Sequence, residues 1–129
     1  MSDHTDRIEA LVERVRERCE SFDPPEDPPD EEAAIEQLRE GAGEAVAIYI
    51  EARTGDFEQI DPEEFERLEE ALNDSLALYA ACYGADVAPD VSIREAAELV
   101  VESHSIREAA VLLTGVPERE AGESWSGRE

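Results

Sequence analysis

The chain has 129 residues, with 41% hydrophobic and 5% aromatic residues, which is enough for one domain whose aliphatic core needs no metal or disulfide. Its 35 acidic residues stand against 11 basic ones, all of them Arg, for a formal net charge of -24. The periodic apolar residues favour a folded domain over the alternative of an acidic disordered chain. The lack of a long apolar run excludes a membrane span, and two Cys without CxxC spacing offer no metal or redox motif.

A first helix is predicted from Asp6 to Ser21, because apolar residues recur at helical spacing on one face. These residues are Ile8, Leu11, Val12, Val15, Cys19 and Phe22. Cys19, like Cys82 further along, is therefore expected to be a buried small hydrophobe. The opposite face mixes Glu residues with Arg14, Arg16 and Arg18 at offsets of three and four, which favours ion pairs within the helix.

The segment DPPEDPPD, from Asp23 to Asp30, is predicted to be a stiff acidic linker. Its prolines remove backbone donors and push the residues before them into extended conformations. A second helix then runs from Glu31 to Arg53, with Asp30 as its N-cap. Gly41 and Gly43 interrupt this helix at a cost in propensity, but they leave small surfaces that another helix can approach closely.

A third helix is predicted from Pro62 to about Tyr83. Asp61, Pro62 and Glu64 give it an N-cap, a Pro at the first helical position and a capping-box Glu, and Gly84 ends it. The second and third helices have matching apolar stripes and a short connection, so we expect a central antiparallel hairpin.

An internal repeat follows this hairpin. The segment SIREAAELV starts at Ser92 and SIREAAVLL starts at Ser105, and each opens with the Ser-x-x-Glu pattern of a capping box. Two short helices are therefore expected, from Ile93 to about Ser103 and from Ile106 to about Leu113. The repeat leaves four residues to dock the pair on the hairpin, namely Leu99, Val100, Leu112 and Leu113.

The pattern divides the chain into four parts: an N-terminal helix at 1–22, a Pro-rich acidic linker at 23–30, a helical core domain at 31–117 and a disordered tail at 118–129. Trp125 lies in this polar tail without a core to join. It is expected either to fold back or to anchor another protein, since Trp is enriched among interface hot spots.

No catalytic, cofactor-binding or metal-ligating constellation is found in the sequence. There is no Gly-rich phosphate loop and no nucleophile elbow, and His4 and His104 belong to no HExxH or ExxH pattern. Glu98, Glu102 and His104 lie close enough in sequence to gather a cation, but solvated side chains at a helix end explain them equally. The chain is therefore not expected to be an enzyme and is expected to need no cofactor.

The repeat also raises the possibility of a degenerate helix-turn-helix. A reading helix must reach base edges, and this segment offers about one suitable side chain, Arg107. The glutamates beside it repel the phosphate backbone that would have to position it. The interpretation that we prefer is a structural pair of helices, with Arg107 as a candidate interaction residue and no DNA partner.

The composition is similar to that of cytoplasmic proteins from haloarchaea that accumulate salt. At molar salt the Debye length falls to about 3 Å, which screens the repulsion on a surface rich in carboxylates and free of Lys. The stretch from Glu64 to Pro117, including FERLEEALNDSLALYAACYG and REAAVLLTGVP, resembles a family of small acidic haloarchaeal proteins with no assigned function. This resemblance implies a setting and a fold, but no activity and no site residues.

Together these observations predict an all-α protein: a small helical bundle with a central antiparallel hairpin, an N-terminal helix and two short C-terminal helices. The expected function is that of a non-enzymatic interaction or regulatory protein in a halophilic cytoplasm, with a degenerate helix-turn-helix transcription regulator as the alternative. The expected partner is another protein and not a membrane, and self-association stays open.

Overall fold

The described part of the chain is helical. The computed structural model describes residues 3–27, 29–54 and 61–116, and these ranges contain no strand. The elements are α1 (Asp3–Ser21), α2 (Glu31–Gln37), the π-helical turn η1 (Leu38–Ala42), α3 (Gly43–Thr54), α4 (Pro62–Cys82), α5 (Ile93–Ser103) and α6 (Ile106–Thr114). The predicted all-α class is confirmed, whereas the predicted tail, with Trp125, lies outside the described residues.

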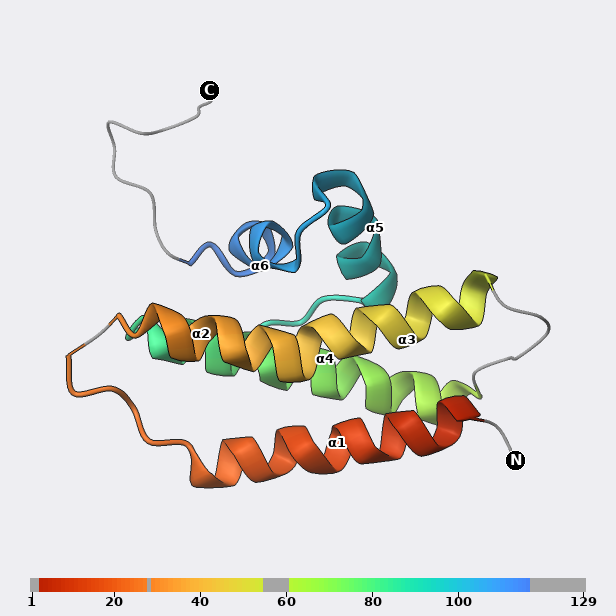
Figure 1. Ribbon diagram of the computed structural model, residues 1–129, viewed down its shortest axis with the longest axis horizontal. Coiled ribbons are helices and arrows are strands. Elements are labelled where there is room, and N and C mark those ends of the chain that lie inside the picture. Colours follow the sequence, from red (N-terminus) through yellow and green to blue (C-terminus); the bar gives the residue numbers. More distant parts are fainter. Residues whose placement is uncertain (1–2, 28, 55–60, 117–129) are drawn as a thin grey trace.

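Three long helical segments lie side by side and form the body of the bundle (Figure 1). α2, η1 and α3 form one continuous helix that packs against α4, and α4 also packs along α1. α5 and α6 lie together over one side of this body, where α5 contacts α3 and α6 contacts η1 and α4. The predicted hairpin, with one N-terminal and two short C-terminal helices around it, is therefore confirmed.

The helices begin where the sequence places their caps. Side-chain oxygens of Asp30, Ser92 and Ser105 accept hydrogen bonds from the backbone N–H three residues later, at 3.1, 3.0 and 3.1 Å. At the start of α4, the Glu64 carboxylate accepts the Asp61 N–H at 3.3 Å, as a capping box requires. These bonds satisfy backbone donors that a helix leaves free in its first turn.

The core confirms most of the predicted stripes and corrects one residue. Leu72 and Leu76 of α4 are completely buried, and Cys82 is buried with them. Cys19, however, is exposed. The buried residues of α1 are Ile8, Leu11, Val12 and Val15, so the buried core ends at Val15 on this helix. Cys19 keeps the helical spacing but lies beyond this core, where Arg18 contacts α2 by donating to the Gln37 side chain at 3.2 Å.

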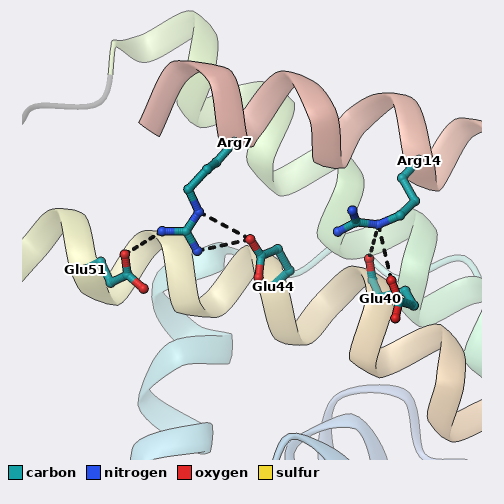
Figure 2. A network of polar contacts seen from close by, with 5 residues as sticks. All are labelled: Arg7, Arg14, Glu40, Glu44 and Glu51. Carbon is teal, nitrogen blue, oxygen red and sulfur yellow. Dashed lines mark hydrogen bonds and ion pairs between the residues drawn. The ribbon is translucent and has the colours of Figure 1, made fainter. Parts of the chain in front are cut away.

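The arginines of α1 pair between helices, which corrects the prediction of pairs within the helix. Figure 2 shows Arg7 bridging Glu44 and Glu51 of α3, and Arg14 reaching Glu40 of η1. On the other side, Arg16 of α1 reaches Glu70 of α4 at 4.0 Å. Intrahelical pairing is outcompeted because α1 packs against both α3 and α4, so carboxylates of two acid-rich helices reach its arginines.

The two repeat helices dock mainly through alanines. Ala96 and Ala97 of α5 and Ala109 and Ala110 of α6 are buried. Of the four residues predicted to dock the pair, Val100 and Leu113 pack against the core and Leu99 is half-buried, but Leu112 is 49% exposed. The prediction for Leu112 was wrong, because α6 packs through positions 106, 109, 110 and 113, and at about 100° per residue position 112 lies to one side of the face that they form.

The second predicted helix is not a regular α-helix throughout. Its middle residues, Leu38–Ala42, form a π turn, in which the Gly43 N–H donates to the Leu38 carbonyl five residues back. Gly41 faces α4 at this turn, and a Cβ at Gly41 would lie only 2.6 Å from the Ser75 Cβ. The close helix approach predicted at Gly41 is thus confirmed, whereas the π turn was not foreseen.

Candidate functional site

An open groove between α3 and α5 is the best candidate for a functional site among the described residues. Its volume is about 630 Å³. The apolar lining comes from Tyr49, Ile50, Ala97 and Val101, and the charged lining comes from Arg53, Arg94, Glu98 and Glu102. Binding sites combine an apolar lining with a few placed polar groups, and this groove has that composition.

The α3 wall of the groove is built around one fixed aromatic ring. Tyr49 is 8% exposed and packs against Phe65 of α4, with the ring centroids 6.1 Å apart. Arg53, one turn later, donates to the Tyr49 hydroxyl at 3.0 Å, and its guanidinium carbon lies 5.8 Å from the Tyr49 ring centroid. This geometry combines a hydrogen bond with a cation–π contact and holds the guanidinium at the groove.

The α5 wall presents an apolar strip between charged side chains. Ala97 is buried, and Val101, one turn later, is 58% exposed. Beside this strip, Arg94 and Glu98 form an ion pair of 3.4 Å along the helix. Both side chains are largely exposed, so the pair contributes little to stability and is free to exchange partners.

α4 fixes the position of α5, and therefore the width of the groove. The Asn73 side chain accepts the Val91 N–H at 2.9 Å and donates to the Val91 carbonyl at 3.0 Å. The Glu69 carboxylate accepts the Ile93 N–H at 2.9 Å, at the N-terminus of α5 where the helix dipole favours a negative charge. The connector before α5 is thus pinned at two points to a central helix.

The interaction residues proposed from the sequence lie elsewhere. Arg107 is exposed on the first turn of α6 and does not line the groove. The neighbouring Tyr83 hydroxyl raises the pKa of Arg107. That hydroxyl is buried and has no well-aligned hydrogen-bond partner, so we interpret the contact with Arg107 as close but not directed. Trp125 lies outside the described residues.

The cation site considered at Glu98, Glu102 and His104 does not assemble. Glu98 and Glu102 line the groove, but His104 is the exposed C-cap of α5 and is not part of the lining. No group of three His, Cys, Asp or Glu residues suited to a metal ion occurs in the ranges that the structure describes. The groove can therefore bury an apolar side chain of a partner, and its charged residues can exchange the Arg94–Glu98 ion pair for pairs with that partner.

The sequence analysis did not identify the groove, although one signal for it was present. Val100 and Val101 are consecutive on α5, and neighbours on a helix lie about 100° apart around its axis. Val100 is partly buried against the core, whereas Val101 is 58% exposed. A large apolar side chain that stays exposed next to a packed one marks a candidate binding surface.

Comparisons with known proteins place the chain in a family to which no activity has been assigned. Residues 2–118 match the family described as Domain of unknown function (DUF8055), and the chain belongs to this family. No curated protein and no solved structure matches the chain significantly. None of the described helices is long and apolar enough to cross a membrane.

Proposed function

Starting from this family, which has no assigned function, we propose that the chain is a non-catalytic interaction protein that binds a segment of another protein in the groove between α3 and α5. The observation that carries the proposal is Val101, a large apolar side chain that is 58% exposed within a preformed groove. Covering this valine and the adjoining Ile50 with a partner's apolar side chain removes apolar surface from water.

Charge argues for a basic partner and against a second copy of the chain. The formal net charge is -24, so two copies would bring like charges into contact, whereas a basic segment pairs with carboxylates at short distance, where salt screens least. At the groove itself, Glu102 and the exposed Glu98 lie one turn apart on α5 and can face basic side chains beside the apolar strip. The occupant that fits is a segment that carries an apolar residue with Arg or Lys next to it.

We place this activity in a salt-rich cytoplasm. The 35 acidic residues and the absence of Lys suit a solvent in which about 1 M salt reduces the Debye length to about 3 Å. Long-range attraction is weak under these conditions, so affinity has to come from apolar contact and from charge pairs at short distance. The groove supplies both within one turn of α5, from Ala97 to Val101.

Site-specific photocrosslinking in a halophilic host tests the proposal. A benzoylphenylalanine at position 101 should capture a basic protein, whereas the same group at Leu112, which is similarly exposed on α6, should not. Adding Glu102→Lys should lower the yield at position 101 several-fold, because it places a cation against a basic partner. Glu108→Lys, an equal charge change at an exposed residue of α6, is the matched control and should leave the yield unchanged.

Each other outcome counts against the proposal. Equal capture at positions 101 and 112, or no capture at either, would mean that the groove is not the binding surface. A product with twice the mass of the chain would identify a second copy as the occupant. Nucleic acid captured at position 112 would instead favour the helix-turn-helix alternative, in which α6 is the reading helix.

A further inference from the structure

The π turn η1 is bridged by a side chain from another helix. Gln37 and Ala42, five residues apart, lie at the start and the end of this turn. The Ala42 N–H donates to the Ser75 hydroxyl of α4 at 2.8 Å, and that hydroxyl donates to the Gln37 carbonyl at 2.9 Å. Ser75 therefore stands between the two backbone groups and satisfies both.

Ser75 is enclosed by its surroundings. It is 1% exposed, and apart from tyrosines no other residue with a hydroxyl, amide or charge is buried to this degree in the described ranges. Gly41 lies against it, and a side chain at position 41 would occupy the place of the Ser75 hydroxyl. From the other side, Arg14 of α1 donates to the Glu40 carbonyl of the same turn at 3.0 Å (Figure 2). The turn is thus braced from α4 and from α1.

The long helix changes its packing partner at this turn. α2, before the turn, packs on α4, whereas α3, after the turn, packs mainly on α5. A π turn accommodates one extra residue, and one residue corresponds to a rotation of about 100° around a helix. The turn therefore sets which face of α3 points toward α5, and that face carries Tyr49 and Arg53 of the groove.

We infer that Ser75 is a positioning residue for the groove: its hydroxyl holds the π turn and so fixes the rotation of α3 against α5. The claim that Ser75 fixes the rotation of α3 depends only on the hydrogen bonds of η1. The claim that this rotation matters for binding rests on the proposed function of the groove. Ser75 itself lies on α4 and is not part of the groove lining.

The test is Ser75→Ala, followed residue by residue with backbone NMR. Removing the hydroxyl takes one hydrogen bond from the Ala42 N–H and one from the Gln37 carbonyl, so amide exchange at Ala42 should become about tenfold faster or more relative to amides of α4. Chemical shifts should change along α3 as far as Tyr49 and Arg53. Ser21→Ala, which removes a hydroxyl bonded to the Glu17 carbonyl within α1, is the control and should affect neither.

Gly41→Ala provides a second way to displace the same hydroxyl and should give the same pattern of shifts along α3. If shift changes in both variants stay confined to the immediate neighbours of positions 41 and 75, Ser75 fills space and positions nothing. Photocrosslinking at position 101 separates the two proposals. If the chemical shifts of α3 do not change in the Ser75 variant and crosslinking at position 101 is intact, only the role of Ser75 is overturned. If the shifts of α3 change but position 101 never captures a partner, the role of Ser75 is supported and only the function of the groove is contradicted.

Discussion

Tyr79 joins the core of the bundle to the end of the described chain. It is completely buried and is the largest such side chain among the described residues. Its hydroxyl donates to the Val116 carbonyl at 2.7 Å, and its ring meets Tyr83 edge-on, with the centroids 5.3 Å apart. Burial, followed by the neighbouring Tyr83, raises the pKa of the Tyr79 phenol. A single buried phenol therefore connects packing to alkaline stability.

We expect stability to decrease as the pH rises above about 10, the ordinary pKa of tyrosine. Below that pH the phenol is neutral in the folded and the unfolded chain. Above it, the unfolded chain loses the proton while the folded chain retains it, so the unfolded state gains stability. Burial also raises the pKa of the Cys82 thiol, so the comparison of Tyr79→Phe with the wild type is needed to isolate the contribution of the phenol. Urea unfolding at about pH 8 and about pH 11 should show a smaller loss in Tyr79→Phe than in the wild type.

At about pH 8, Tyr79→Phe should be less stable than the wild type by about 0.5–1.5 kcal/mol, because the bond to Val116 is lost, and this difference should shrink toward about pH 11. The two effects are separable in a plot of the free energy of unfolding against pH. Loss of the hydrogen bond lowers this free energy at neutral pH, whereas ionisation of the phenol determines how steeply it falls above about pH 10. If the wild type and the variant lose the same free energy of unfolding between these two pH values, Tyr79 does not control the decrease in stability at alkaline pH.

The two repeat helices end in the same backbone conformation with different residues. His104 after α5 has φ 59°, and Gly115 after α6 has φ 74°. Their N–H groups donate to Val100 at 2.7 Å and to Val111 at 2.8 Å, which closes each helix. Glycine adopts this left-handed conformation without strain, whereas a residue with a Cβ does not. The α5 end is therefore the strained member of the pair.

Exchanging the residue types should change stability in opposite directions. His104→Gly is expected to raise the free energy of unfolding by about 0.5–1 kcal/mol, since it relieves left-handed strain at a helix end. Gly115→Ala should lower it by about 1–2 kcal/mol. A Cβ at Gly115 meets nothing within 4 Å, so this loss would come from the backbone and not from a collision. Thermal or urea unfolding of both variants measures the effect, and two changes of the same sign would contradict it.

The whole molecule combines local ion pairs with a large excess of negative charge. Several of its ion pairs span different helices, such as Arg7 with Glu44 at 3.0 Å and Arg67 with Glu9 at 3.6 Å. Each exposed pair of this kind contributes about 0–1 kcal/mol, and salt weakens it. Salt also weakens the repulsion among the carboxylates that remain unpaired at a net charge of -24. The weakening of this repulsion should outweigh the weakening of the ion pairs, because acidic residues outnumber basic ones more than threefold.

We therefore expect the folded state to need salt. Helical circular dichroism should show a clearly higher melting temperature in molar KCl than in dilute buffer, as the Debye length decreases from about 30 Å at 0.01 M to about 3 Å at 1 M. Arg7→Gln is a useful companion, because it should destabilise the protein more in dilute buffer, where its ion pairs are strongest. Equal melting temperatures of the wild type in the two solvents would refute the expectation.

The sequence by itself determined the elements of this protein and their ends. The N-caps of four helices are Asp30, Asp61, Ser92 and Ser105. A cap is a contact between residues three positions apart, so it can be predicted from their spacing in the sequence. The apolar stripes likewise specified the hairpin and the burial of Leu72 and Leu76. Local geometry and periodicity are properties of the chain alone, so they can be inferred without a fold.

Only the tertiary structure decided how neighbouring helices share their surfaces. The arginines of α1 pair across helices, and Cys19 lies beyond the buried core, because both depend on what the adjacent helix presents. The π turn depends on the Ser75 hydroxyl, which lies 38 positions from the carbonyl that it satisfies. The groove exists because α3 rotates at that turn and α4 pins α5 beside it. Such contacts join residues that have no spacing relation in the sequence, so their energies become defined only when the helices pack.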